Sequence, residues 1–248
     1  MLEQQQRPSP AAAEHLLVVE GLTAGYGGAP IIQDVEFRAR KGEITAVVGP
    51  NGAGKSTFLK VVVGVLPCTK GKVVLNGKDV TGLPAQKLVR EGISYIPQVA
   101  NVFPSLTVKE NLEMGAYALR SGVKEKIAHV CDLFPDLKPA FKRPARTLSG
   151  GQRTMLAIAR SLMLDPQVLI LDEPTAGLAP KFVETVWSRV TAIRQMDVAV
   201  VIVEQNTRRT LTHADWAYVM VLGRTRLSGT GRQLLDDPEV VDLYIGKE

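Results

Sequence analysis

The chain has 248 residues, a length that suits one domain or one domain with an inserted segment. Hydrophobic residues make up 45% and charged residues 22%, which excludes a chain that is disordered throughout. The 30 Lys and Arg residues exceed the 25 Asp and Glu residues by five. These positive charges are scattered, which favours a solvated surface over a nucleic-acid patch, so we expect no nucleic-acid partner.

The sequence also bears on the compartment. No apolar run approaches the roughly 18 residues that cross a bilayer. Residues 1–15 are polar, lack a signal-peptide pattern and predict a flexible tail. The two cysteines, Cys68 and Cys131, form no disulfide framework. We therefore expect a cytosolic protein whose membrane role depends on a partner.

Hydrophobic periodicity predicts strands and helices that alternate along the chain. We expect strands within 16–48 and at 72–77, 93–97, 167–171, 198–203, 216–222 and 225–229, and helices at 55–66, 107–120, 123–134, 152–164, 180–196 and 206–214. Fully apolar strands between helices predict a parallel sheet covered on both faces. The expected domain, 16–248, has a core at 16–98 and 165–248 and a helical insertion at 99–164.

A phosphate-binding loop is predicted at GPNGAGKS, residues 49–56, which fits G-x-x-x-x-G-K-[ST] between a strand and a helix. The glycines let backbone N–H groups close around phosphate oxygens, and the start of the helix adds attraction. Lys55 is expected to bridge the β- and γ-phosphates, and Ser56 to hold Mg²⁺. A chance match of four fixed positions would occur in about 1% of chains of this length.

Two carboxylates end the apolar run QVLILDEP, residues 167–174. Asp172 falls at the carboxyl end of a strand, where α/β sheets bind ligands, and is expected to hold Mg²⁺ through water. Glu173 can accept a proton from an attacking water. Two adjacent acids could instead cap a following helix, an alternative that the neighbouring phosphate loop weakens.

A second small-residue helix start is LSGGQR, residues 148–153. Ser149, Gly150 and Gly151 suit either an ordinary helix cap or an anion site. One nucleotide needs only one phosphate loop. A second site in the same chain therefore suggests that it serves a nucleotide bound to another subunit.

Over residues 16–248 the chain resembles the nucleotide-binding subunit of ABC transporters, and its motifs come in the order of that family. The resemblance implies a P-loop NTPase core, an antiparallel β subdomain at its edge, an inserted helical subdomain, and Mg²⁺ bound with ATP. It implies that Tyr26 stacks on adenine, that Gln98 touches Mg²⁺ and water, and that Glu173 is the catalytic base. The implied ATP-binding residues are Tyr26, Gly49, Pro50, Asn51, Gly52, Ala53, Gly54, Lys55, Ser56 and Thr57. The residues implied to contact the ATP of the opposing subunit are Leu148, Ser149, Gly150, Gly151 and Gln152. The implied metal ligands are Ser56, Gln98 and Asp172.

Three stretches resemble the ATPase subunit of branched-chain amino-acid importers: VFPSLTVKENLEMG at 102–115, EQN at 204–206 and the tail at 229–246. Subunits of urea and short-chain amide importers are similar. The resemblance implies membrane permease subunits, a second ATPase subunit (a copy or a paralogue), a separate solute-binding protein, and a peripheral position on the cytoplasmic face of the membrane. The alternative from another class is a soluble ABC protein that does not transport.

Two positions depart from the family pattern. Ala179, in the segment AGLAP, stands where the family usually has Asp. Gln205 stands where the family usually has the switch histidine. Glutamine exchanges no proton near neutral pH, as histidine does. We expect the Gln205 amide to donate to the γ-phosphate and to act in catalysis. The alternative is that Gln205 only caps the helix that begins near Asn206.

Overall fold

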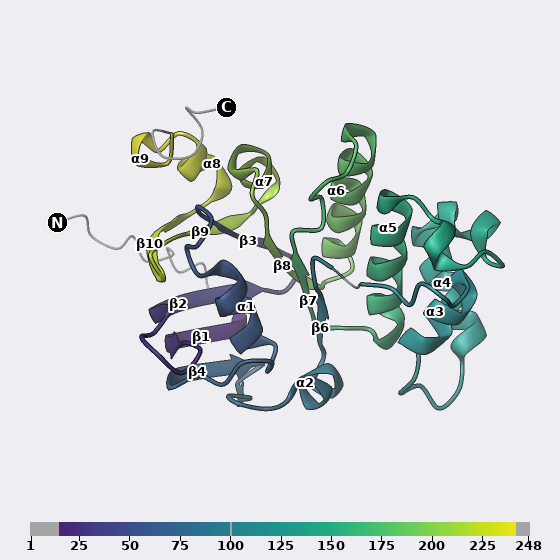
Figure 1. The fold of residues 1–248 in the computed structure, drawn as a ribbon, viewed down its shortest axis with the longest axis horizontal. Coiled ribbons are helices and arrows are strands. Elements are labelled where there is room, and N and C mark those ends of the chain that lie inside the picture. Colours follow the sequence, from purple (N-terminus) through teal and green to yellow (C-terminus); the bar gives the residue numbers. More distant parts are fainter. Residues whose placement is uncertain (1–14, 100, 242–248) are drawn as a thin grey trace.

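The fold is described from a computed structural model that places residues 15–99 and 101–241. Its larger sheet has the strand order β10-β9-β3-β8-β7-β6 (Figure 1). These strands are β3 (Ile44–Val48), β6 (Ile93–Ile96), β7 (Val168–Asp172), β8 (Ala199–Val203), β9 (Trp216–Val221) and β10 (Arg224–Gly229). All neighbours pair in parallel except β9 and β10. The predicted, mostly parallel core is therefore confirmed.

The smaller sheet is antiparallel, with the order β2-β1-β4-β5, and lies beside the larger one (Figure 1). Its strands are β1 (His15–Ala24), β2 (Ile32–Arg40), β4 (Lys70–Leu75) and β5 (Lys78–Asp79). In β2, Val35, Phe37 and Ala39 are buried while Glu36 and Arg38 are exposed. This alternation is what a strand with one face on the core requires, and it confirms the predicted antiparallel sheet.

The central strands of the larger sheet, β3, β7 and β8, are buried on both faces. In β3, Ala46 and Val48 pack into one hydrophobic cluster, and Val47 between them packs into another. The first cluster contains α5 (Gly150–Ser161) and α6 (Pro180–Arg194), whereas the second contains α1 (Lys55–Val62) and the smaller sheet. Both clusters anchor the strands, so the loops at the strand ends are held in fixed positions.

Between β6 and β7 the described chain is helical and lies to one side of the sheet (Figure 1). It contains α3 (Val108–Gly115), α4 (Val123–Leu133), α5 and the short 3₁₀ helices η1 (Pro135–Ala140), η2 (Ala145–Thr147) and η3 (Leu162–Leu164). Thr107 begins α3 with a capping box that includes Glu110. At Gly115 an added Cβ would lie 2.6 Å from Arg160, so the end of α3 packs closely on α5.

Some expected boundaries were wrong. Helix α1 ends at Val62 rather than at residue 66. The reason is that Gly64 adopts a left-handed φ of 70°, and the backbone at Gly64 passes close to the Leu83 carbonyl. The helix expected at 107–120 ends at Gly115. The sequence prediction also missed α2 (Ala85–Glu91), α8 (Gly231–Leu235) and α9 (Pro238–Val240).

Within residues 15–99 and 101–241, no helix is both long and apolar enough to cross a membrane. Residues 1–14 of the expected tail lie outside the described residues, as do 242–248, and His15 already belongs to β1.

One packing contact predicts a pH dependence of stability. His213, at the end of α7 (Thr207–His213), stacks on Trp187 with ring centroids 4.5 Å apart. The pKa of His213 is lowered from its ordinary value, mainly by burial. Glu184 opposes this shift and Arg209 adds to it. The unfolded state therefore binds the proton more tightly than the folded state does. The contribution of neutral His213 to the free energy of unfolding is fully present above the unfolded pKa, about 6.5, and is lost as the pH falls through that value.

We therefore expect the melting temperature of the wild type to fall between pH 7.5 and 5.5, and to fall less in His213→Phe, which keeps the stacking but cannot titrate. Thermal unfolding of both proteins across this pH range is the measurement. Parallel curves would contradict the assignment to His213.

Candidate nucleotide site

Four neighbouring strands end at the same edge of the larger sheet. Gly49 follows β3, Glu204 follows β8, Glu173 follows β7, and Gln98 lies two residues beyond β6. The registers place Val203 beside both Val47 and Asp172. Since the carboxyl ends of parallel strands are where α/β proteins bind ligands, the polar residues gather for a topological reason.

The loop after β3 has the backbone conformation of a phosphate cradle. Gly49, Gly52 and Gly54 have φ values of 149°, 79° and 97°, which side chains disfavour. An added Cβ on Gly49 would lie 2.2 Å from the Met220 carbonyl oxygen. Gly54 precedes α1 and provides no side-chain cap, so the first N–H groups of the helix stay free for an anion.

Lys55 lies inside this loop and is 5% exposed. Its ammonium donates to the carbonyl oxygens of Gly49 at 2.7 Å and Pro50 at 3.0 Å. Burial lowers the pKa of Lys55, whereas the nearby Glu173 and Asp172 carboxylates raise it. The buried cation is therefore paired mainly with carbonyl dipoles, which leaves it available to a polyanion.

Asp172 ends β7 and is 8% exposed. Its Oδ2 accepts a hydrogen bond from the Tyr95 hydroxyl at 3.1 Å. Burial raises the pKa of Asp172 and Glu173 raises it further, while Tyr95 and two lysines lower it. Burial and Asp172 in turn raise the pKa of Tyr95, so the phenol stays protonated and donates. The sequence prediction missed Tyr95, whose only signal was its place in the strand beside β7.

Glu173 is held at three points. Its backbone has a left-handed φ of 47°, and its N–H donates to the Val203 carbonyl at 2.8 Å. Its Oε2 accepts from the Nε2 of Gln98 and from the Nε2 of Gln205, each at 2.8 Å. The structure thus brings together the three residues that were expected to be catalytic, and both amides orient the carboxylate.

The structure excludes one of the two interpretations of Gln205. Asn206, not Gln205, caps α7, because its side chain accepts from the Arg209 N–H at 2.9 Å. The capping alternative for Gln205 is therefore wrong. Its amide has a second N–H, so a contact to a γ-phosphate stays compatible with the bond to Glu173 and stays a prediction.

The residues present suit Mg²⁺, which prefers oxygen ligands. Ser56 is exposed in the first turn of α1, and only one oxygen of Asp172 bonds to Tyr95. Gln98 gives its amide N–H to Glu173, which leaves its carbonyl oxygen for a ligand. The donor set fits the ion, although the assignment itself stays a prediction.

Tyr26 lies beside the second turn of α1. Its ring is 57% exposed, and its hydroxyl accepts from the Lys60 ammonium at 3.3 Å. A hydrogen bond with Thr57 is the largest of the effects that lower the pKa of Tyr26. The exposed ring therefore lies next to the helix that begins at the phosphate loop, with the Lys60 ammonium 5.6 Å from its centroid, and stacking on adenine stays a prediction.

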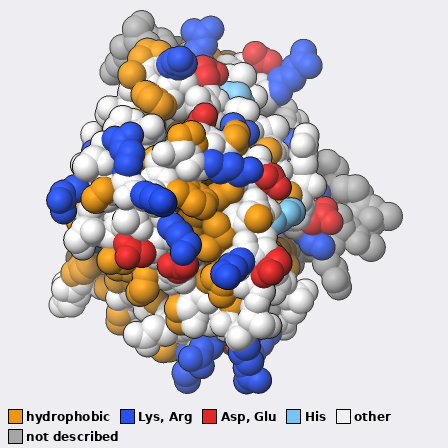
Figure 2. Space-filling model, turned by 90° about the vertical axis from the view of Figure 1, so that its right-hand side faces the viewer, with side chains coloured by type: hydrophobic (Ala, Val, Ile, Leu, Met, Phe, Trp, Pro, Cys, Tyr) orange, Lys and Arg blue, Asp and Glu red, His pale blue; other side chains and the backbone are white. Residues whose placement is uncertain are grey.

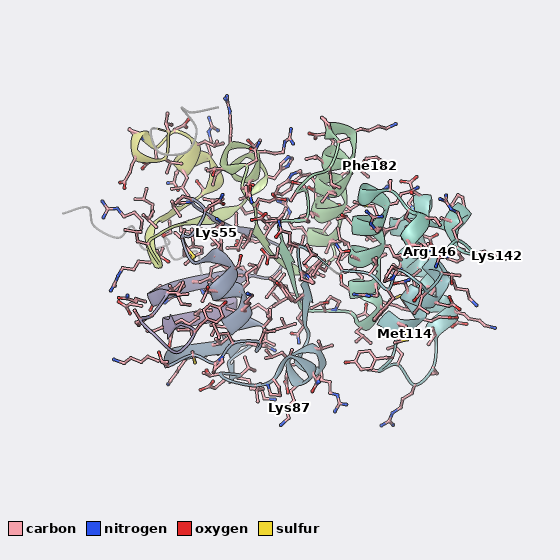
Figure 3. The ribbon with its side chains drawn as sticks, viewed as in Figure 1. Lys55, Lys87, Met114, Lys142, Arg146 and Phe182 are labelled. Carbon is pink, nitrogen blue, oxygen red and sulfur yellow. The ribbon has the colours of Figure 1, made fainter. Side chains whose placement is uncertain are left out.

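The LSGGQ segment does not join this site within the chain. Ser149 caps α5 in a capping box with Gln152, and an added Cβ on Gly151 would lie 2.4 Å from the Phe182 ring. Figure 3 shows Phe182 well apart from Lys55. Ser149 therefore has the ordinary capping role, and Gly151 lets α5 approach α6. Contact with another subunit's nucleotide stays a prediction.

A parallel sheet with a phosphate loop, a strand-end aspartate and an oriented glutamate defines a nucleotide-hydrolysing α/β protein. The sequence profile of the family described as "ABC transporter" matches residues 32–176. This is more than half of the chain, and the chain therefore belongs to the ABC transporter ATP-binding family and is an ATPase.

Curated relatives cover nearly the whole chain. A probable branched-chain amino acid transport ATP-binding protein LivF of Archaeoglobus fulgidus is 45% identical, over 91% of this chain and 96% of its own. The high-affinity branched-chain amino acid transport ATP-binding protein BraG of Pseudomonas aeruginosa is 38% identical, over 93% and 100%. The lipopolysaccharide export system ATP-binding protein LptB of Haemophilus influenzae is 34% identical, over 94% and 98%.

Solved structures agree with the fold. The ADP conformation of MJ1267, an ATP-binding cassette of an ABC transporter, matches with a TM-score of 0.85 and 29% identity, over 94% of this chain and 100% of that one. CbiO1 of Clostridium perfringens, part of the ABC transporter complex cbiONQ, matches with a TM-score of 0.82 and 27% identity, over 92% and 93%. The chain thus has the fold of a nucleotide-binding subunit.

The glutamine at position 205 predicts a pH profile. Because Gln205 does not titrate, we expect Gln205→His to gain a pH-dependent change in kcat near pH 6.5 that the wild type lacks. Gln205→Ala removes a hydrogen bond to a charged group, worth about 1.5–3 kcal/mol, and should lower kcat by about 10- to 150-fold with a smaller change in KM.

The measurement is the rate of ATP hydrolysis between pH 5.5 and 8.5 for the three proteins. Identical profiles for the wild type and Gln205→His, together with unchanged kcat in Gln205→Ala, would contradict a catalytic role for position 205.

Proposed function

We propose that the chain is the ATP-hydrolysing subunit of an importer for branched-chain amino acids. The observation that carries hydrolysis is the carboxylate of Glu173, oriented by two amides beside the phosphate loop. The substrate class rests on the similarity to LivF and BraG, which exceeds that to the exporter subunit LptB. The ATPase subunit of a urea or short-chain amide importer is the alternative, which rests on the sequence resemblance alone.

In the proposed reaction, Lys55 binds the β- and γ-phosphates and Glu173 accepts the proton of the attacking water. Gln98 and Gln205 keep the carboxylate in place as the proton transfers. Ser56, Asp172 and Gln98 would hold Mg²⁺, which when bound neutralises charge on the phosphate oxygens. The Lys55 ammonium and the free N–H groups at the start of α1 stabilise the negative charge that develops.

The LSGGQ segment is proposed to complete the site of a second ATPase subunit, which is either a copy of this chain or a paralogue. Its Gly151 packs against Phe182, which lies well apart from the chain's own Lys55 (Figure 3). Ala179, which replaces an acidic residue of the family pattern, is exposed and precedes α6 directly. The exposure of Ser149 and Ala179 supports a contact with a second subunit.

ATP-binding subunits of this family work with membrane permease subunits, and the helical part offers a surface for them. A cavity of about 310 Å³ is lined by Phe103, Met114, Tyr117 and Arg160, among others. The Arg160 guanidinium lies 4.8 Å from the centroid of the Phe103 ring and has no ion pair within the described part of the chain. An apolar helix with an acidic side chain would suit this cavity.

Figure 2 shows the outer face of the helical part, where hydrophobic side chains lie exposed among Lys and Arg side chains. Val99, Phe103, Met114 and Tyr117 are the large hydrophobic side chains exposed in this part of the described chain. We propose that residues 99–164 form a helical subdomain whose loop 99–106, in which Ala100 is not described, contacts the permease at the cytoplasmic face of the membrane. A separate solute-binding protein would deliver the substrate.

The experiment is ATP hydrolysis by the transporter in proteoliposomes, after the membrane subunits that co-purify with the tagged chain have been identified. We expect the solute-binding protein to stimulate hydrolysis when it carries leucine, isoleucine or valine, but not when urea or acetamide is supplied. Stimulation by an amide alone, or co-purification without any membrane subunit, would contradict the proposed function.

A further inference from the structure

Glu204 is a buried carboxylate that the reaction described above does not use. It follows β8 directly and is 4% exposed. Its Oε1 accepts two hydrogen bonds from Thr175, one from the backbone N–H at 2.9 Å and one from the hydroxyl at 2.7 Å. Burial raises the pKa of Glu204, while the bonds from Thr175 lower it. Because a buried carboxylate is costly, these two donors and the backbone N–H of Gln205, whose hydrogen bond also lowers the pKa, keep it in place.

Thr175 lies two residues beyond Glu173. The segment 173–175 is held by three consecutive residues at the end of β8, namely Val203, Glu204 and Gln205. The Val203 carbonyl accepts from the Glu173 N–H. The Glu204 carboxylate holds Thr175, and the Gln205 amide donates to the Glu173 side chain. The end of β8 therefore fixes the segment 173–175 at its backbone, at its far end and at its reacting carboxylate.

The backbone at Glu173 requires such support. Its φ of 47° is unfavourable for a residue with a side chain, so the segment would relax if its contacts were removed. Beyond Thr175 the loop continues as a turn, in which the Leu178 N–H donates to the Thr175 carbonyl at 3.2 Å and which leads to Ala179. Thr175 is thus the fixed point between Glu173 and the exposed loop.

We propose that Glu204 is a positioning residue for ATP hydrolysis: by holding Thr175 it keeps the Glu173 carboxylate in line with the phosphate loop. The contact acts through Thr175 and not on the nucleotide. Its loss should therefore lower kcat and leave nucleotide binding intact. The inference concerns the ATPase reaction and does not depend on which solute is transported.

The test compares Glu204→Leu with Glu204→Gln in the full chain, assembled with its partner subunits. Leu has a similar size but accepts no hydrogen bond, and we expect kcat to fall by about 10- to 150-fold, the factor for hydrogen bonds to a charged group. Gln keeps a carbonyl oxygen for Thr175, and we expect kcat to stay within about threefold of the wild type. KM for ATP should change by less than about threefold in both.

Asp215, whose side chain is 35% exposed, provides a control at the opposite end of the sheet. Its Oδ2 accepts from the Ile44 N–H at 2.8 Å, where β3 begins, and Arg194 donates to the same carboxylate. We expect Asp215→Leu to lower the melting temperature without changing kcat. If the Glu204 carboxylate only supported the fold, Glu204→Leu would behave in the same way.

Thr175→Val keeps the backbone N–H but removes the hydroxyl donor, so it tests the contact if Glu204→Leu does not fold. We expect its kcat to fall with KM unchanged, and Thr175→Ser to restore the wild-type rate. The double variant of Glu204→Leu and Thr175→Val should lose no more kcat than Glu204→Leu alone, because Glu204→Leu already removes the hydroxyl bond that Thr175→Val removes.

Two results would overturn the inference. One is a folded Glu204→Leu or Thr175→Val that keeps more than half of the wild-type kcat. The other is a loss of kcat in Glu204→Gln as large as that in Glu204→Leu, since the negative charge and not the hydrogen bonds would then matter.

Discussion

Glu173→Gln should lower kcat for ATP by about 10²- to 10⁴-fold, the usual contribution of a general base, and leave the affinity for ATP near that of the wild type. Gln has the size of Glu and can still accept from Gln98 and Gln205 through its carbonyl oxygen, but it has no basic oxygen for the proton of water. The measurements are phosphate release and the binding of a fluorescent ATP analogue.

A matched control is Glu184→Gln, on the exposed side of α6, where the carboxylate only approaches Arg209 at 3.7 Å. Its kcat should equal that of the wild type. A Glu173→Gln protein with more than a tenth of wild-type kcat would contradict the role of Glu173 as the base.

With ATP and the second ATPase subunit present, light scattering should show that the Glu173→Gln dimer persists. A mass that never rises would contradict the proposed role of LSGGQ in the other subunit's site.

Lys55→Ala should abolish turnover and weaken ATP binding by about 10- to 150-fold, because a hydrogen bond to a charged group contributes about 1.5–3 kcal/mol. The ammonium also bonds to the carbonyl oxygens of Gly49 and Pro50, so its loss removes contacts that hold the loop in shape. Equilibrium binding of labelled ATP and the rate of phosphate release measure the two effects.

Lys41→Ala is the control for the loss of a positive charge, since Lys41 is exposed and only approaches Asp197 at 3.7 Å. Binding and turnover in this variant should match the wild type. Normal turnover in Lys55→Ala would contradict the assignment of the phosphate loop.

Much of this site could be predicted because its parts are contiguous in sequence. The loop from Gly49 to Ser56 needs glycines and a lysine at fixed spacing, and Asp172 ends a run of five buried residues. The parallel core was equally predictable, since strands buried on both faces have no polar alternation. Ser149 and Thr107 begin helices with capping boxes that are visible in the sequence.

The remaining features depend on contacts between distant segments. Tyr95 reaches Asp172 only because β6 pairs with β7, and Glu204 reaches Thr175 only because β7 pairs with β8. The approach of Gln98 and Gln205 to one oxygen of Glu173 likewise follows from strand order. Strand order is set by tertiary packing, so no local pattern encodes these contacts.

In the proposed function, hydrolysis at Glu173 energises the import of branched-chain amino acids. The most direct measurement is the uptake of radiolabelled leucine into proteoliposomes that contain the assembled transporter, its solute-binding protein and internal ATP. We predict uptake that depends on ATP in the wild type, that disappears in Glu173→Gln and that unlabelled isoleucine or valine suppresses. Uptake that persists in Glu173→Gln, or its absence in a wild-type transporter that hydrolyses ATP, would contradict the claim.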